Sequence, residues 1–236
     1  MGFIIVNIVL ALVPSLLLLL YFYRRDRQKR EPISLVWKIF AIGCLSVVPA
    51  GIIELVLDAF SGYFAGPLLI FIRAFIIAAL VEESLKLSVV HFFVYNRKEF
   101  DEVVDGIVYT ISASLGFAFF ENMLYSFGPP ATLVIRGITA VPLHAIASGI
   151  MGYYIGISKM GGVSMIGKGL FYAVLIHGLY DYFLFTGTII AFLVIPLLII
   201  CWFILRNLTN KALEIDKKEG HGYEPGTEND QEPNGI

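Results

Sequence analysis

The sequence predicts an all-α membrane protein, a polytopic bundle of about seven transmembrane helices. Of its 236 residues, 58% are hydrophobic and 15% are charged, whereas soluble domains have roughly 45–50% and ~25%. Apolar runs of about 20 residues, the length of a membrane-spanning helix, recur along most of the chain. Lysine and arginine gather in alternate connections between these runs, as they do in multi-pass proteins.

The apolar runs place the predicted spans in order at roughly residues 3–23, 34–57, 74–95, 104–127, 137–157, 165–186 and 188–206. The first run is not a cleavable signal, because its positive cluster follows the apolar stretch instead of preceding it. Residues 61–73 are apolar but interrupted by Gly and Pro. They are either an interfacial or re-entrant segment or an early start of the third helix.

The distribution of positive charge predicts the orientation in the membrane. Residues 24–33 hold five Lys or Arg, and further ones lie in 96–103, after the fifth span and in the C-terminal tail. The connections near 58–66 and 128–135 hold none. By the positive-inside rule, the N-terminus lies outside and the C-terminus inside.

The chain is expected to form one membrane domain. We assign residues 1–206 to this domain and residues 207–236 to a cytoplasmic tail, which we expect to be disordered because it is polar and rich in Gly, Pro, Glu and Asn. The two cysteines, Cys44 and Cys201, lie far apart in apolar runs and are interpreted as buried small side chains.

Two adjacent acids and a lysine interrupt the third span. Glu82, Glu83 and Lys86 lie within an apolar run, where a charged side chain costs roughly 2.5–3.5 kcal/mol at the bilayer centre and is usually functional. Lys86 is four residues from Glu82 and three from Glu83, so it can neutralise either acid on its own helix. The alternative is a structural ion pair between helices.

Ionisable residues of four predicted helices share one depth. At 1.5 Å per residue, they lie roughly 8–14 Å below the outer helix ends. They are Glu82, Glu83, Glu121, His144, His177 and Asp181. Because independent scatter would rarely give this coincidence, it is the main indication of a site, although Glu121 and the His177–Asp181 pair could instead be packing contacts.

Residues near this layer have simpler interpretations. Arg73 and Arg136 near the outer boundary are expected to pair with Glu54 and Asp58. The fifth predicted helix carries His144, Ser148, Gly152 and Gly156 at successive i,i+4 positions, a small-residue face that allows close helix packing. The acidic residues at 101–105 are expected to cap the fourth helix.

Paired glutamates with two histidines suggest hydrolysis. One glutamate would act as a general base on water, and the histidines would bind a metal or donate hydrogen bonds to the oxyanion. His144, His177 and Glu121 would supply the three protein ligands of a catalytic zinc. Asp181, four residues after His177, could accept its N–H and orient the ring. The residues leave the presence of a metal open.

The chain contains a series of motifs: Glu82-Glu83-x-x-Lys86, Asp105-Gly106-Ile107-Val108-Tyr109, Gly116-Phe117-x-x-x-Glu121-Asn122, Arg136 through Pro142-Leu143-His144-Ala145, Gly152-Tyr153-Tyr154-Ile155-Gly156 and His177-Gly178-Leu179-Tyr180-Asp181. They are preceded by Pro14, Tyr21-Phe22-Tyr23 and Glu31-Pro32. Together these motifs resemble the PrsW family of bacterial multi-pass membrane proteases, and the resemblance covers residues 1–206. It implies location in a bacterial cell membrane and the first (site-1) cut in a single-span anti-sigma factor on its extracytoplasmic side. Such a cut starts regulated intramembrane proteolysis and releases a sigma factor in a stress response.

The resemblance also places the chain in the wider superfamily of CAAX prenyl proteases, in which Glu121 stands where many members have His. It implies a metallopeptidase, although metal-independent glutamate catalysis is the alternative among relatives. We therefore predict a peptidase with Glu82 or Glu83 as base, Lys86 holding the charge of the other acid, and His144 and His177 as ligands or oxyanion donors. Glu121 is a third ligand or second base.

We expect a single-span protein substrate and membrane lipid as partners, and no nucleic acid. Two alternatives from other classes use the same polar cluster: a proton-coupled transporter, and a non-catalytic binding or immunity protein. A transporter predicts ionisable groups along a path to both faces, whereas the predicted cluster lies in the outer half.

Overall fold

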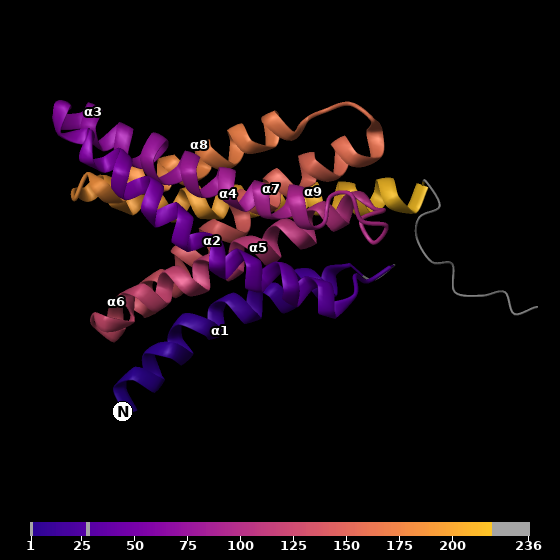
Figure 1. Cartoon of the computed structure of the whole chain (residues 1–236), viewed down its shortest axis with the longest axis horizontal. Coiled ribbons are helices and arrows are strands. Elements are labelled where there is room, and N and C mark those ends of the chain that lie inside the picture. The colour runs from indigo at the N-terminus through magenta and orange to yellow at the C-terminus, as the bar shows by residue number, and fades with distance from the viewer. Residues whose placement is uncertain (1, 27–28, 219–236) are drawn as a thin grey trace, which may run out of the picture.

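A computed structural model describes residues 2–26 and 29–218, and this part of the chain is helical without any strand. It confirms the all-α prediction. Figure 1 shows an elongated bundle in which most long helices run close to one common axis, with the N-terminal end of α1, α3 and α6 toward one end of the molecule.

The helices follow the predicted order. They are α1 (Gly2–Arg25), α2 (Ile33–Ala59), α3 (Gly66–Phe71), the π-helical segment η2 (Ile72–Ala79), α4 (Leu80–Phe93), α5 (Val103–Leu124), α6 (Pro130–Ile138), α7 (Ala140–Gly161), α8 (Ile166–Phe185) and α9 (Val194–Lys218). Short 3₁₀ turns lie at Ser61–Tyr63, Tyr125–Phe127 and Ile189–Leu193.

Residues 61–73, for which the sequence allowed two interpretations, contain an early start of the third predicted helix. From Gly66 the backbone stays helical through α3, η2 and α4 to Phe93. The π-helical turns end at Ala79, just before the acids of α4. Because each π turn widens the helix, it rotates the residues that follow, and such turns are frequent next to functional sites.

Within the described residues, five helical stretches are long and apolar enough to cross a membrane: Ile5–Arg25, Ile33–Tyr63, Val103–Phe127, Pro130–Gly161 and Ile189–Lys218. The predicted spans 74–95 and 165–186 are helical as well but fall outside this set. Both carry ionisable residues of the predicted site, which lower their hydropathy. The orientation across the membrane stays a prediction.

The end of α9 differs from the prediction. Residues 207–218, which we expected to be disordered, continue this helix to Lys218. Thr209, Ala212 and Asp216 are buried, so this end of α9 packs against the bundle. Tertiary packing therefore outweighs the polar composition of residues 207–218. The rest of the predicted tail, 219–236, lies outside the described residues.

Helix α5 forms the centre of the bundle, with most of its side chains buried between α1, α2 and α7. A Cβ atom added to Gly106 would lie 2.3 Å from the carbonyl oxygen of Gly152, and one added to Gly152 would lie 2.3 Å from that of Gly106. The predicted small-residue face of α7 therefore does bring two backbones into direct contact.

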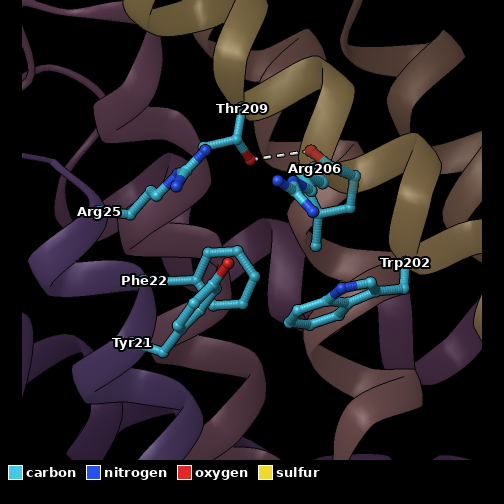
Figure 2. A pocket seen from close by; sticks show the side chains of 7 residues that line it. Tyr21, Phe22, Arg25, Trp202, Arg206 and Thr209 are labelled. Carbon is cyan, nitrogen blue, oxygen red and sulfur yellow. Dashed lines mark hydrogen bonds between the residues drawn. The ribbon is translucent and has the colours of Figure 1, made fainter.

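Aromatic packing fastens the end of α1 to α9, as Figure 2 shows. The ring of Tyr21 lies 5.6 Å from that of Trp202, and the ring of Phe22 lies 5.9 Å from it. Thr209 donates a hydrogen bond of 2.9 Å to the carbonyl of Leu205 beside them. The space left is about 10 Å³, which is at most one water, so these side chains form a packed contact and not a ligand site.

Candidate active site

The carboxylate of Glu83 is fully enclosed and held at both oxygens. Its Oε1 accepts a hydrogen bond of 2.7 Å from Lys86 Nζ and lies 3.0 Å from His177 Nδ1. Its Oε2 accepts a hydrogen bond of 2.7 Å from Ser148 Oγ. Its exposed fraction is 0%. Three helices, α4, α7 and α8, thus meet at one carboxylate.

Lys86 is completely buried and is the positive centre of the site. Besides Glu83, its Nζ donates to Glu82 Oε2 at 3.1 Å and lies 2.8 Å from His144 Nδ1. The three N–H groups of the ammonium match these three acceptors. The ring of Phe117 lies beneath it, 4.5 Å from Nζ.

His144 links this centre to Glu121. Since an ammonium has only donors, His144 Nδ1 accepts from Lys86 and the ring proton belongs on Nε2. Nε2 lies 3.0 Å from Glu121 Oε2. The other oxygen of Glu121 pairs with Arg136 Nη2 at 2.7 Å.

The pairing of Arg136 corrects one prediction. Arg73 pairs with Asp58 at 2.8 Å as expected, whereas Arg136 turns inward to Glu121 instead of pairing at the boundary. The helix is interrupted at Thr139, between α6 and α7, and Arg136 lies in the last turn of α6 before this interruption. A sequence gives no signal for such an inward turn.

His177 faces carboxylates at both ring nitrogens. Nδ1 contacts Glu83, and Nε2 lies 3.4 Å from Asp181 Oδ2 and 4.0 Å from Glu82 Oε2. The ring of His144 is 5.2 Å away, edge to face. The structure therefore brings together every site residue predicted from the sequence.

Two cavities meet at Glu82 and Glu121. One of about 210 Å³ is lined by both carboxylates, both imidazoles, Arg136 and Asp181, among others. The second, of about 280 Å³, lies between α2, α4 and α5 and shares Glu54, Glu82, Glu121 and Tyr125 with the first. Glu82 is 7% exposed and Glu83 is 0% exposed, so Glu82 is the acid of the pair that borders the cavities.

The sequence did not predict three members of the site. Ser148 was seen only as a small residue, although its i,i+4 spacing from His144 placed its hydroxyl on the same helix face. Arg136 and Glu54 were assigned to the membrane boundary. Glu54 instead lines both cavities.

The ligand atoms of Glu82, His144 and His177 lie within 4.8 Å of one another. This donor set is of the type that holds catalytic zinc, and it contains Glu82 where we expected Glu121. Lys86 Nζ, however, stands 2.8 Å from His144 Nδ1 and 3.1 Å from Glu82 Oε2. Lys86 at Nδ1 and Glu121 at Nε2 already engage both ring nitrogens of His144. As arranged, the side chains do not fit a metal, and we derive no catalytic step through one.

A helical membrane bundle with buried carboxylates and imidazoles around a polar cavity has the architecture of a membrane-embedded hydrolase. The profile of the family described as "PrsW family intramembrane metalloprotease" matches residues 31–206. The chain belongs to this family. It is therefore a multi-pass membrane peptidase, which disfavours the transporter and the non-catalytic alternatives.

Curated relatives cover most of the chain. "Protease PrsW" of Geobacillus kaustophilus is 42% identical over 179 residues, which are 72% of this chain and 76% of the relative. The proteins of the same name from Halalkalibacterium halodurans and Bacillus subtilis are 34% and 32% identical, over 88% and 87% of this chain and 97% and 94% of their own lengths. No solved structure matches the chain significantly.

The unfolding free energy of a Lys86 variant tests the electrostatics of the site without a measurement of activity. We expect Lys86→Met to destabilise the protein by about 3–5 kcal/mol, because it leaves buried carboxylates without their counter-charge. Adding Glu83→Gln removes one of these charges and should restore part of the loss. Unfolding in detergent would be followed by circular dichroism, with exposed Lys38→Met on α2 as the matched control. A further loss in the double variant would contradict this account.

Proposed function

We propose that this peptidase makes the first cut in a single-span anti-sigma factor on its extracytoplasmic side, with Glu82 as the general base. Glu82 carries the proposal because it borders both cavities while it stays within reach of two imidazoles. The substrate class follows from the family resemblance. The side of cleavage follows from the predicted orientation, since the cavity reaches Tyr125 and Phe185 near helix ends that we place outside.

In this mechanism the two adjacent glutamates have different roles. Glu82 takes a proton from a water in the cavity while the water oxygen attacks the scissile carbonyl carbon. The same carboxyl then gives the proton to the leaving amine as the peptide C–N bond breaks. Glu83 holds Lys86 and His177 in place and does not touch the substrate. Lys86 donates a hydrogen bond to Glu82 and holds its carboxylate in place.

Cationic and imidazole donors that line the smaller cavity together with Glu82 would stabilise the tetrahedral intermediate. His177 and Arg136 both line the smaller cavity and present N–H groups, which stabilise an oxyanion most when they are fixed in advance. Asp181 fixes the ring of His177, and Glu121 fixes Arg136 and His144. Asp181 and Glu121 are thus positioning residues in this proposal.

The larger cavity suggests how a membrane-spanning substrate reaches Glu82. Its wall contains apolar or small residues of α2 and α5, including Val47, Gly51 and Leu124. The outer surface of α2 beside it is apolar and exposed, with Ile52 60% and Leu55 75% exposed. A substrate helix that packs on α2 could place its unwound end in this cavity.

Changing the proposed base should abolish cleavage without unfolding the protein. We expect Glu82→Gln to lower the cleavage rate of a co-expressed anti-sigma factor by about 10²–10⁴-fold, the usual contribution of a general base. Glu214→Gln, the same change at an exposed position of α9, should leave the rate unchanged. Cleavage would be followed by immunoblot. A Glu82→Gln variant that cuts at the normal rate would exclude Glu82 as the base.

Filling the larger cavity should obstruct the substrate. A Cβ atom at Gly51 meets nothing within 4 Å, so Gly51→Phe can fold while its ring enters the cavity. We expect it to raise KM several-fold with a smaller effect on kcat. Gly167→Phe on α8, which also has open space, is the control. Equal kinetics for both variants would rule out this route.

A zinc-selective chelator tests the role of Lys86. Because Lys86 and Glu121 already engage both ring nitrogens of His144, we expect purified enzyme to keep its cleavage rate after treatment with a chelator that spares calcium and magnesium. The measurement is cleavage of a purified substrate before and after treatment. Loss of activity that added zinc restores would contradict this expectation and show that catalysis depends on a metal.

A further inference from the structure

A second cluster of acidic residues lies away from the cavities, where the α1–α2 connection meets the beginning of α5. Carboxylate oxygens of Asp26, Glu102 and Asp105 lie within 4.8 Å of one another, and the same holds for Glu31, Asp101 and Asp105. Asp26, Glu102 and Asp105 are each at most 1% exposed. Asp105 belongs to both groups and connects them.

Part of this cluster has ordinary structural partners. Asp105 Oδ2 accepts from the backbone N–H groups of Asp101 and Glu102 at 2.9 and 2.7 Å, so the predicted capping of α5 is confirmed. Asp216 of α9 accepts from the next two N–H groups of α5. Tyr109 donates to Glu31, and Lys29 pairs with Asp101. Asp26 is also engaged by neighbouring groups.

Glu102 is different, because among the described residues neither of its carboxylate oxygens makes a hydrogen bond, although the side chain is 1% exposed. It faces the backbone N–H of Asp105 in a capping box, but this contact does not meet the geometry of a hydrogen bond. Oδ1 of Asp105 lacks a donor as well. A buried carboxylate without donors is unfavourable by several kcal/mol.

The charged neighbours of Glu102 are mostly acidic and include the carboxylates of Asp26, Asp216 and Asp101. A cation bound between these carboxylate oxygens would offset their mutual repulsion.

We propose that Asp26, Glu102 and Asp105 form a binding site for a hard divalent cation, separate from the active site. All of the ligand atoms are carboxylate oxygens, which calcium and magnesium prefer and zinc does not. Oxygens that share a calcium ion lie at most about 4.6–5.2 Å apart, and the oxygens of this cluster lie within 4.8 Å of one another. The cluster can therefore take an ion of the size of calcium.

Such an ion would join parts of the chain that meet at this end of the bundle. Asp26 follows α1, whereas Glu102 and Asp105 begin α5, and Asp216 attaches α9 to the same helix start. Arg25 also donates to Asn210 of α9 nearby. The cation would thus stabilise the end of α5 opposite to Glu121.

Terbium(III), a luminescent substitute for calcium, tests the site in the full-length protein in detergent. Tyr109, which is hydrogen-bonded to Glu31 within the cluster, can sensitise its emission. We expect emission that calcium displaces and a melting temperature that calcium raises. Glu102→Gln should lower the terbium affinity at least about tenfold, since it removes a charged ligand. Glu214→Gln should bind terbium like the wild type.

The cation-free proteins give an independent readout. Glu102→Gln removes an uncompensated charge, so without calcium it should melt at or above the wild-type temperature and show no further rise with calcium. If this variant does not accumulate, Asp26→Asn has the same expected loss of affinity. Terbium emission or a calcium-dependent melting shift that survives in the variant would overturn the proposal. So would a wild type that responds to neither ion, since protons would then neutralise the cluster.

Discussion

The burial of one lysine between two glutamates governs the geometry of this protein. Removing an ammonium and a carboxylate from water costs several kcal/mol for each ion, which is recovered only when every donor and acceptor is matched. The three partners of Lys86 come from α4 and α7, and those of Glu83 include Ser148 of α7 and His177 of α8. These helices must therefore converge at one depth. The candidate active site and the polar core of the bundle are the same set of contacts.

The contacts of Glu82 and Glu83 also explain why these two adjacent, chemically identical acids differ in their access to the cavities. Glu83 uses both oxygens in contacts with three helices and is closed to water. Glu82 shares the lysine but keeps a face on the cavities. A rigid carboxylate that positions its neighbours and an accessible one that meets substrate are the two parts that general-base hydrolysis needs.

Helix α5 connects the active site with the second acidic cluster. Its far end carries Glu121 at the cavities, and its beginning carries Glu102 and Asp105 beside α9. Between these ends it packs backbone to backbone against α7 at Gly106, which leaves little freedom for sliding. Stabilising the beginning of α5 would therefore help to hold Glu121 in place. Helix α5 is thus a rigid central element of the bundle.

The sequence by itself determined the class of fold, the helical segments and which ionisable residues lie inside the bundle, because spans of about 20 apolar residues and charges within them are local signals. Only the tertiary structure decided that Arg136 turns inward to Glu121, that Ser148 holds Glu83, and that α9 stays helical to Lys218. It also decided that Lys86 and Glu121 engage both ring nitrogens of His144, an expected metal ligand. Each of these outcomes depends on how neighbouring helices are rotated about their axes, and packing between distant segments sets that rotation.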